Sequence, residues 1–196
     1  TILIVVSNPM DTMTYLVHKT TGVSKNRIIG MGGALDSARF KYRLAEALNA
    51  PISDVDGMVI GGHSDKGMVP LISKATRNSI KVTNFLSDEK LNQVREDTKV
   101  GGATLTKLLG TSAWYAPGAA VSSLVHSIAC NHNKVFPCSA FLDGEYGLSD
   151  LCIGVPVVLG KNGIEEIIEL ELNPEDLAQL SESADGVKKT NSLLSL

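Results

Sequence analysis

The sequence has 196 residues, of which 43% are hydrophobic and 20% are charged, and its formal net charge is −3. This composition supports a packed globular core and excludes a disordered chain. The weak negative charge gives no electrostatic reason to expect nucleic acid or an anionic membrane as a partner. No apolar run approaches the roughly 20 residues that a membrane-spanning helix needs.

The chain opens on a β-branched run, residues 1–6, which is typical of a strand buried on both faces of a parallel sheet. Nothing precedes this strand, so we expect a fragment whose N-terminal part is missing; a short edge strand at a true N-terminus is the alternative. Residues 11–21 are predicted to form a helix that ends at Gly22. Residues 26–30 are predicted to form a second short buried strand.

The rest of the chain mixes helices with hairpins. The first helix, over residues 35–49, carries an apolar stripe of Leu35, Ala38, Tyr42, Ala45 and Leu48. The further predicted elements, in order, are strands at 56–63 and 68–73, a helix over 87–98, a break at Gly101 and Gly102, a helix over 117–130, strands at 134–142, 151–160 and 164–170, and a helix that begins at Pro174 with Asn173 as its cap. This order predicts the last strands of an α/β domain followed by an α+β domain.

The cysteines are odd in number and form no CxxC pair, which is typical of reduced thiols in a cytosolic protein. They are Cys130, Cys138 and Cys152. With His126 and His132, Cys130 could imitate a set of zinc ligands. However, the i, i+4, i+6 spacing places His132 on another face if the helix continues, and no second ligand pair follows, so we expect no metal site.

A glycine cluster opens the helix that begins near residue 35. Gly30, Gly32 and Gly33 start a dinucleotide-binding pattern, but Leu35 stands where G-x-G-x-x-G needs its last glycine. A leucine there obstructs the close helix–strand packing that this glycine permits. We therefore interpret the glycines as a tight turn that leads into a helix.

Asp36 and Arg39 lie three positions apart, so they share one face of that helix. A surface ion pair and a functional pair explain them equally well. His63 follows an apolar strand and two glycines, a position where loops often carry chemistry. A histidine paired with an aspartate gains a fixed tautomer and a raised pKa, which suits proton exchange near neutral pH.

A hydrolase is a weaker interpretation of the same residues. His63, Ser64 and Asp65 are adjacent, and adjacent side chains cannot form a catalytic triad. Residues 110–114 resemble the G-x-S-x-G elbow of hydrolases but lack its second glycine.

Four segments together resemble the lactate/malate dehydrogenase family: VVSNPMDTMTY, GMGGALDSARFKYRLAEAL, MVIGGHSDKGMVPL and SAWYAPGAAV. The resemblance covers nearly the whole chain, and LDSARF followed by GGHSD is highly specific. GGHSDKGMVPL and YAP look more like the malate branch, especially the malate dehydrogenases that are similar to lactate dehydrogenases. The resemblance implies NAD-dependent interconversion of malate and oxaloacetate. A lactate dehydrogenase and a non-catalytic oligomerisation or binding fragment are the alternatives.

The resemblance also implies roles for individual residues. His63 would be the catalytic acid/base, and Asp36 would hold it and stabilise its charged form. Arg39 would grip the substrate carboxylate through two parallel hydrogen bonds. Asn8 would bind the reacting oxygen, and Ser112 would line the substrate pocket. The residues flanking the nicotinamide would be Val6, Ser7 and Asn8.

The resemblance implies that residues 1–30 are a remnant of a Rossmann-type NAD-binding domain and that 31–196 form the substrate-binding, catalytic domain. The family's G-x-G-x-x-G strand, its ribose-binding acidic residue and its mobile arginine-bearing loop are absent from the sequence. We therefore expect the chain by itself to be inactive. The implied partners are malate or oxaloacetate and further copies of the chain in a homo-oligomer, a dimer or tetramer; the implied location is the cytoplasm.

Overall fold

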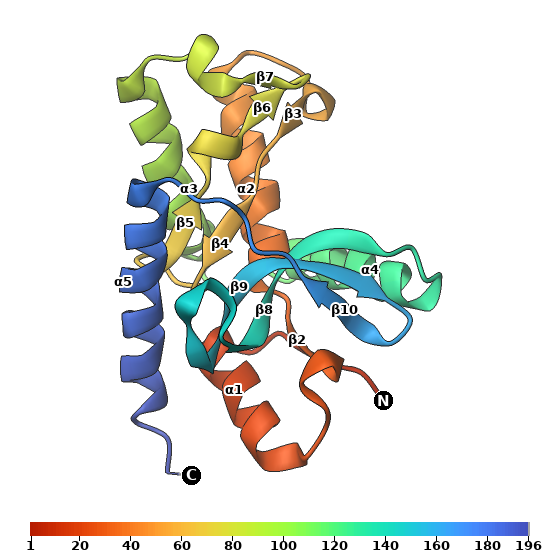
Figure 1. The fold of residues 1–196 in the computed structure, drawn as a ribbon. Coiled ribbons are helices and arrows are strands. Elements are labelled where there is room, and N and C mark those ends of the chain that lie inside the picture. Colours follow the sequence, from red (N-terminus) through yellow and green to blue (C-terminus); the bar gives the residue numbers. More distant parts are fainter. Residues whose placement is uncertain (196) are drawn as a thin grey trace.

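The computed structural model describes residues 1–195, which form a mixed central sheet and a small second sheet (Figure 1). The central sheet has the order β1-β2-β8-β9-β4-β5, with β10 paired to β9. Its strands are β1 (Leu3–Val5), β2 (Ile28–Gly30), β4 (Val59–Gly61), β5 (Met68–Pro70), β8 (Lys134–Asp143), β9 (Ser149–Gly160) and β10 (Gly163–Ile167). The small antiparallel sheet comprises β3 (Val55–Asp56), β6 (Thr76–Arg77) and β7 (Ile80–Lys81).

The α-helices are α1 (Met10–Thr21), α2 (Gly32–Ala47), α3 (Asp88–Leu109), α4 (Tyr115–Ala129) and α5 (Pro174–Asn191). Short 3₁₀ turns lie at Lys25–Arg27, Ile52–Asp54, Ile72–Lys74, Val82–Asn84 and Glu145–Gly147. Helix α5 runs along one side of the molecule in Figure 1 and contacts β4, β5, β9 and α1. Within residues 1–195, no helix combines the length and the apolar character needed to cross a membrane.

The strand directions confirm the predicted fold class. β1 and β2 are parallel and are joined by α1, whereas β2–β8, β8–β9, β4–β9 and β4–β5 are all antiparallel. The sheet therefore passes from a parallel α/β pair into an α+β domain. Residues 3–5 differ from the prediction of burial on both faces, since they are half-buried and β1 lies at the edge of the described sheet.

The main core surrounds β8 and β9. Along β9, Leu151, Ile153, Val155 and Val157 are fully buried, and so is Cys152 on the opposite side of the strand. Continuous burial of this kind requires cover on both faces of the sheet. Helices α1, α4 and α5 all pack against β9 and supply that cover.

Helix α2 begins three residues earlier than predicted and includes two of the glycines in its first turn. The chain passes from β2 into α2 within one residue, as the interpretation of a tight turn requires, but Gly30, Gly32 and Gly33 all lack a positive φ, so the turn does not depend on the conformational freedom of glycine. A Cβ on Gly32 would lie 2.7 Å from the His63 side chain, and one on Gly33 would lie 2.8 Å from the Pro137 carbonyl oxygen. Glycine is therefore needed at these positions for close packing of α2 against its neighbours.

The buried face of α2 also differs from the predicted apolar stripe. Ala38 and Tyr42 are exposed, whereas Ser37, Phe40 and Leu44 are buried. Ser37 tolerates burial because its hydroxyl accepts a 2.8 Å hydrogen bond from the Val59 backbone N–H. Because the hydrogen-bonded Ser37 is buried, the buried face of α2 differs from the face that the apolar residues alone predict.

Helix α3 runs through the glycines that were predicted to break it. Its N-cap is Ser87, whose side chain accepts the Lys90 N–H. The helix continues past Gly101 and Gly102 to Leu109, so the predicted break is wrong. Packing of α3 against α2 stabilises this glycine-containing turn and overrides its low helix propensity.

Candidate active site

His63 lies just beyond β4, and its imidazole faces the first turns of α2. His63 Nδ1 is 2.6 Å from Asp36 Oδ2, and the Asp36 side chain is 2% exposed. A carboxylate in this position accepts the Nδ1–H and so fixes the tautomer of the ring. Nε2 is then the nitrogen that can exchange a proton with a bound molecule.

Asp36 also contacts Arg39, one turn further along α2. Arg39 Nη1 lies 3.1 Å from Asp36 Oδ1, and the Arg39 side chain is 21% exposed. The pair is therefore mostly buried rather than a surface ion pair. The structure brings Asp36, Arg39 and His63 together, as the sequence suggested.

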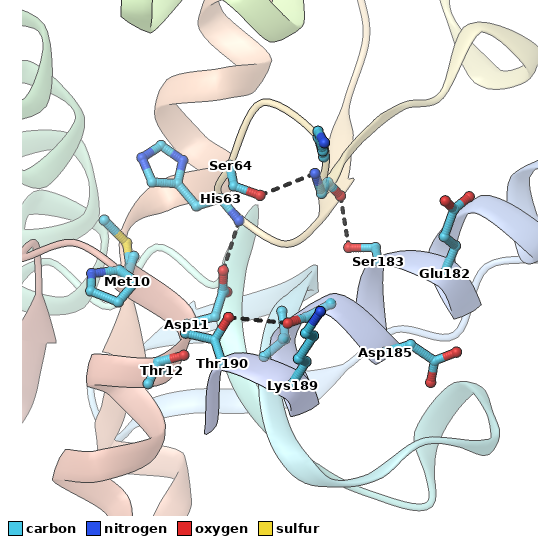
Figure 2. A pocket seen from close by; sticks show the side chains of 15 residues that line it. Met10, Asp11, Thr12, His63, Ser64, Glu182, Ser183, Asp185, Lys189 and Thr190 are labelled. Carbon is cyan, nitrogen blue, oxygen red and sulfur yellow. Dashed lines mark hydrogen bonds between the residues drawn. The ribbon is translucent and has the colours of Figure 1, made fainter. Parts of the chain in front are cut away.

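A second carboxylate holds His63 through its backbone. Asp11 Oδ2 accepts the His63 N–H at 2.7 Å, and Asp11 Oδ1 accepts the Ser139 hydroxyl at 2.6 Å. Figure 2 shows Asp11 in the first turn of α1, directed at the His63 loop. Asp11 was not among the residues predicted to lie in the site. The available signal was an acidic residue that opens a helix directly after a strand end.

The two carboxylates shape the electrostatics of His63. Burial lowers the pKa of His63, but the hydrogen bond and charge of Asp36 raise it, with help from the charge of Asp11, and the net result is a raised pKa. Burial also raises the pKa of Asp11, which the Ser139 hydroxyl and the His63 N–H only partly offset. The arrangement therefore favours a protonated imidazole near neutral pH.

His63 and Arg39 border a cavity of about 550 Å³ between α2, α3 and the end of β1. Asn8 and Ser112, the other residues that the resemblance assigned to substrate binding, also line it. Of the residues predicted beside the nicotinamide, Val6 and Asn8 line the cavity. Ser7 is exposed and does not line it. Asp36 does not line the cavity itself. It lies behind the cavity wall, where its carboxylate contacts Arg39 and His63.

A second cavity of about 430 Å³ lies on the other side of the His63 loop. Figure 2 shows side chains of α5 around it, including Glu182, Asp185 and Lys189. Arg39 and Asn8 do not line this cavity. The first cavity therefore collects the groups suited to binding a carboxylate and exchanging a proton.

The histidines and cysteine near the end of α4 do not lie as predicted. The helix ends at Ala129, so His132 is not carried to another helical face. Instead, the ring centroids of His126 and His132 are 4.8 Å apart, and Cys130 Sγ lies 3.7 Å from His126 Nδ1.

Residues 33–193 match the family model described as lactate/malate dehydrogenase, alpha/beta C-terminal domain. The chain belongs to the lactate/malate dehydrogenase family. Malate dehydrogenase of Bacteroides thetaiotaomicron is 62% identical over 98% of this chain, and the aligned part is 62% of that relative. The chain thus spans less than two thirds of the length of the curated relatives it matches.

Solved structures of the family share the fold closely. Malate dehydrogenase from Salinibacter ruber matches with a TM-score of 0.94 and 43% identity, over 97% of this chain and 62% of that one. Lactate dehydrogenase from Eimeria maxima with NADH and oxamate matches with a TM-score of 0.93 and 37% identity, over 97% of this chain and 59% of that one. Both branches of the family therefore share the scaffold that places His63, Asp36 and Arg39.

Proposed function

We propose that the protein containing this chain interconverts malate and oxaloacetate by hydride transfer to and from NAD. The observation that carries the proposal is that two groups line the same cavity: the imidazole of His63, which is paired with a carboxylate, and the guanidinium of Arg39. The names of the relatives at 58–63% identity support malate as the substrate.

His63 acts as the acid and base of the reaction. In malate oxidation the neutral Nε2 takes the proton from the substrate hydroxyl while the carbon that bears this hydroxyl gives up its hydrogen as hydride, which leaves a carbonyl group. In oxaloacetate reduction the protonated ring returns a proton to the carbonyl oxygen. Asp36 holds the ring at 2.6 Å and stabilises its cationic form. NAD, when bound, accepts or supplies the hydride.

Arg39 binds a substrate carboxylate. Its Nη1 is engaged by Asp36, which anchors the guanidinium and leaves Nη2 and Nε to donate two parallel bonds. Asn8 is placed to donate a side-chain N–H to the reacting oxygen, and Ser112 to contact the substrate from the α3–α4 connection. The spacing between His63 and Arg39 then sets which carbon of the substrate meets Nε2.

The residues at the end of β1 fit a nicotinamide. Val6 offers an apolar surface that is 42% exposed, and Asn8 offers an amide on the same cavity. A flat ring that carries a carboxamide matches this combination of apolar and hydrogen-bonding groups. We propose that residues 1–30 belong to an NAD-binding domain and residues 31–196 to the substrate-binding, catalytic domain.

We also propose a cytoplasmic homo-oligomer. Cys130, Cys138 and Cys152 are free thiols, which suits a reducing compartment. Trp114 and Tyr115, at the α3–α4 corner, are 64% and 87% exposed, and such apolar surface favours association. Light scattering on the purified full-length protein would test the oligomer.

The proposed activity is tested by following NADH oxidation with oxaloacetate and with pyruvate. We expect the full-length protein to turn over oxaloacetate with the higher kcat/KM. A preference for pyruvate would support a lactate dehydrogenase instead. Absence of turnover with both substrates would overturn the catalytic proposal and favour a binding or oligomerisation module.

A further inference from the structure

The end of α4 gathers three potential metal ligands. Within residues 1–195, one group of three such side chains lies close together, namely His126, Cys130 and His132. Their ligand atoms all lie within 4.8 Å of one another. All three residues are exposed, so they are accessible to an ion from solution. Cys130 Sγ and His126 Nδ1 are 3.7 Å apart.

The backbone brings His132 back over the last turn of the helix. Asn131 adopts the left-handed conformation, with φ of 52°, directly after the C-cap Cys130. The His132 N–H donates to the Ser127 carbonyl at 2.9 Å, and the Asn131 N–H donates to the Ile128 carbonyl at 3.2 Å. These bonds form the Schellman motif, which reverses the chain at a helix end. The reversal places His132 next to His126.

Further hydrogen bonds fix this reversal to the sheet. The buried Ser127 hydroxyl donates to the Leu159 carbonyl at 3.0 Å. Asn131 Oδ1 accepts the Lys161 N–H at 2.9 Å, in the turn between β9 and β10. The ligand-bearing backbone is therefore held before any ion binds, which lowers the entropic cost of binding.

We propose that His126, Cys130 and His132 bind a zinc-class divalent ion, with a water or an external ligand in the fourth position. Zn–S and Zn–N bonds of about 2.3 and 2.0–2.1 Å in a tetrahedron place neighbouring ligand atoms about 3.3–3.7 Å apart. The sulfur–nitrogen separation of 3.7 Å already meets this requirement. The remaining separations close by rotation of exposed side chains. A thiolate with two imidazoles suits zinc and cobalt, not calcium or magnesium, which prefer oxygen ligands.

The site is separate from the candidate active site. Pro117, in the first turn of α4, lines the His63 cavity, whereas His126 lies nine residues further on, about 13 Å along the helix axis. A bound ion would tie the end of α4 to the segment before β8. We therefore expect metal binding to raise the thermal midpoint and to leave turnover unchanged.

The test is a Co²⁺ titration of the full-length protein after removal of metals with a chelator. We expect one equivalent per chain, with a thiolate-to-cobalt charge-transfer band and the d–d bands of a tetrahedral ion, and displacement by Zn²⁺. Cys130→Ser should abolish the charge-transfer band. His132→Gln should weaken binding at least about tenfold, because loss of a ligand costs no less than loss of an outer-shell partner.

The matched control is His18→Gln, since His18 packs on Phe141 away from the cluster and should leave the titration unchanged. Circular dichroism verifies that each variant is folded. Absence of the bands in the unaltered protein, an unchanged titration of Cys130→Ser, or one ion shared by two chains would overturn the proposal.

Discussion

The backbone N–H of His63 donates a 2.7 Å hydrogen bond to the buried carboxylate of Asp11. Asp11 in turn accepts the Ser139 hydroxyl, so α1, the His63 loop and β8 are joined at one carboxylate. His63 thus faces one acidic group at its ring, Asp36, and another at its backbone. The position and the protonation of the proposed acid/base depend on both.

The charge of Asp11 sets part of the pH dependence. Since Asp11 helps to raise the pKa of His63, Asp11→Asn should lower that pKa. Oxaloacetate reduction needs the protonated ring, which persists only up to the pKa of His63. The alkaline limit of kcat/KM for reduction should therefore move to lower pH. The measurement is the pH profile of the full-length protein.

Asn is a suitable replacement, because its carbonyl oxygen can accept the His63 N–H while its amide donates to Ser139. The control is Glu182→Gln, which removes a carboxylate from the second cavity without touching His63. An unshifted alkaline limit in Asp11→Asn would show that Asp11 acts on the fold alone.

His63→Asn should lower kcat by about 10²-fold or more, the lower range for lost general acid–base catalysis. Asp36 occupies Nδ1 of His63, so Nε2 is the ring nitrogen that can exchange a proton with the substrate. An asparagine amide cannot deliver a proton from that position. NADH affinity, followed by fluorescence titration, should stay near that of the unaltered protein. Near-normal turnover would contradict the assignment of His63 as the acid/base.

The pairing of Asp36 with Arg39 and the choice of His63 could be predicted from local signals, whereas the contact between His63 and Asp36, 27 positions apart, was implied only by the family resemblance. Asp36 and Arg39 share a helical face at i, i+3, and His63 follows an apolar strand. The role of Asp11 depends instead on His63, which is 52 positions away in the sequence, and on Ser139, which is 128 positions away. No local sequence pattern contains residues so far apart.

The predictions that differed most from the structure concern the glycine-rich segments, and the reason is physical. A glycine-rich segment favours a turn when considered locally. Gly33 and Gly102 instead lie within helices: a Cβ on Gly33 would lie 2.8 Å from the Pro137 carbonyl oxygen, and one on Gly102 would lie 3.3 Å from Arg39 Nη1. His132 was misplaced because the spacing argument assumed that α4 continues, whereas Asn131 ends it in the left-handed conformation.

Arg39→Lys should raise the KM for oxaloacetate although the charge is kept. A lysine ammonium cannot provide two parallel donors, and it lacks the planar group that Asp36 anchors at 3.1 Å. The measurement is steady-state kinetics across oxaloacetate concentrations, with NADH saturating. An unchanged KM would assign Arg39 to a structural ion pair.

Gly102→Ala should also weaken oxaloacetate binding, through Arg39. The added Cβ would lie 3.3 Å from Arg39 Nη1, so the guanidinium must shift by a few tenths of an ångström. Because a misplacement of about 1 Å can cost about 10²-fold in rate, we expect a smaller loss of kcat/KM here. Gly101→Ala is the matched control, since its Cβ would lie 3.7 Å from Arg39 Cδ, an ordinary contact. Equal kinetics in both variants would contradict this role of Gly102.

Gly33→Ala and Gly186→Ala should change stability in opposite directions. Both glycines lie in helices, and in a helix interior such as that of Gly186 alanine gains about 0.8–1.0 kcal/mol of helix propensity; at Gly33, in the first turn of α2, the gain is no larger. At Gly186 nothing lies within 4 Å of the added Cβ, and the gain should appear as a raised thermal midpoint. At Gly33 the Cβ would lie 2.8 Å from the Pro137 carbonyl oxygen, so α2 and β8 must separate. Overpacking of this kind costs about 1–3 kcal/mol, which exceeds the gain and should lower the midpoint. Thermal unfolding of the two variants beside the unaltered full-length protein measures both shifts, and a raised midpoint for Gly33→Ala would show that β8 yields to the new methyl group at little cost.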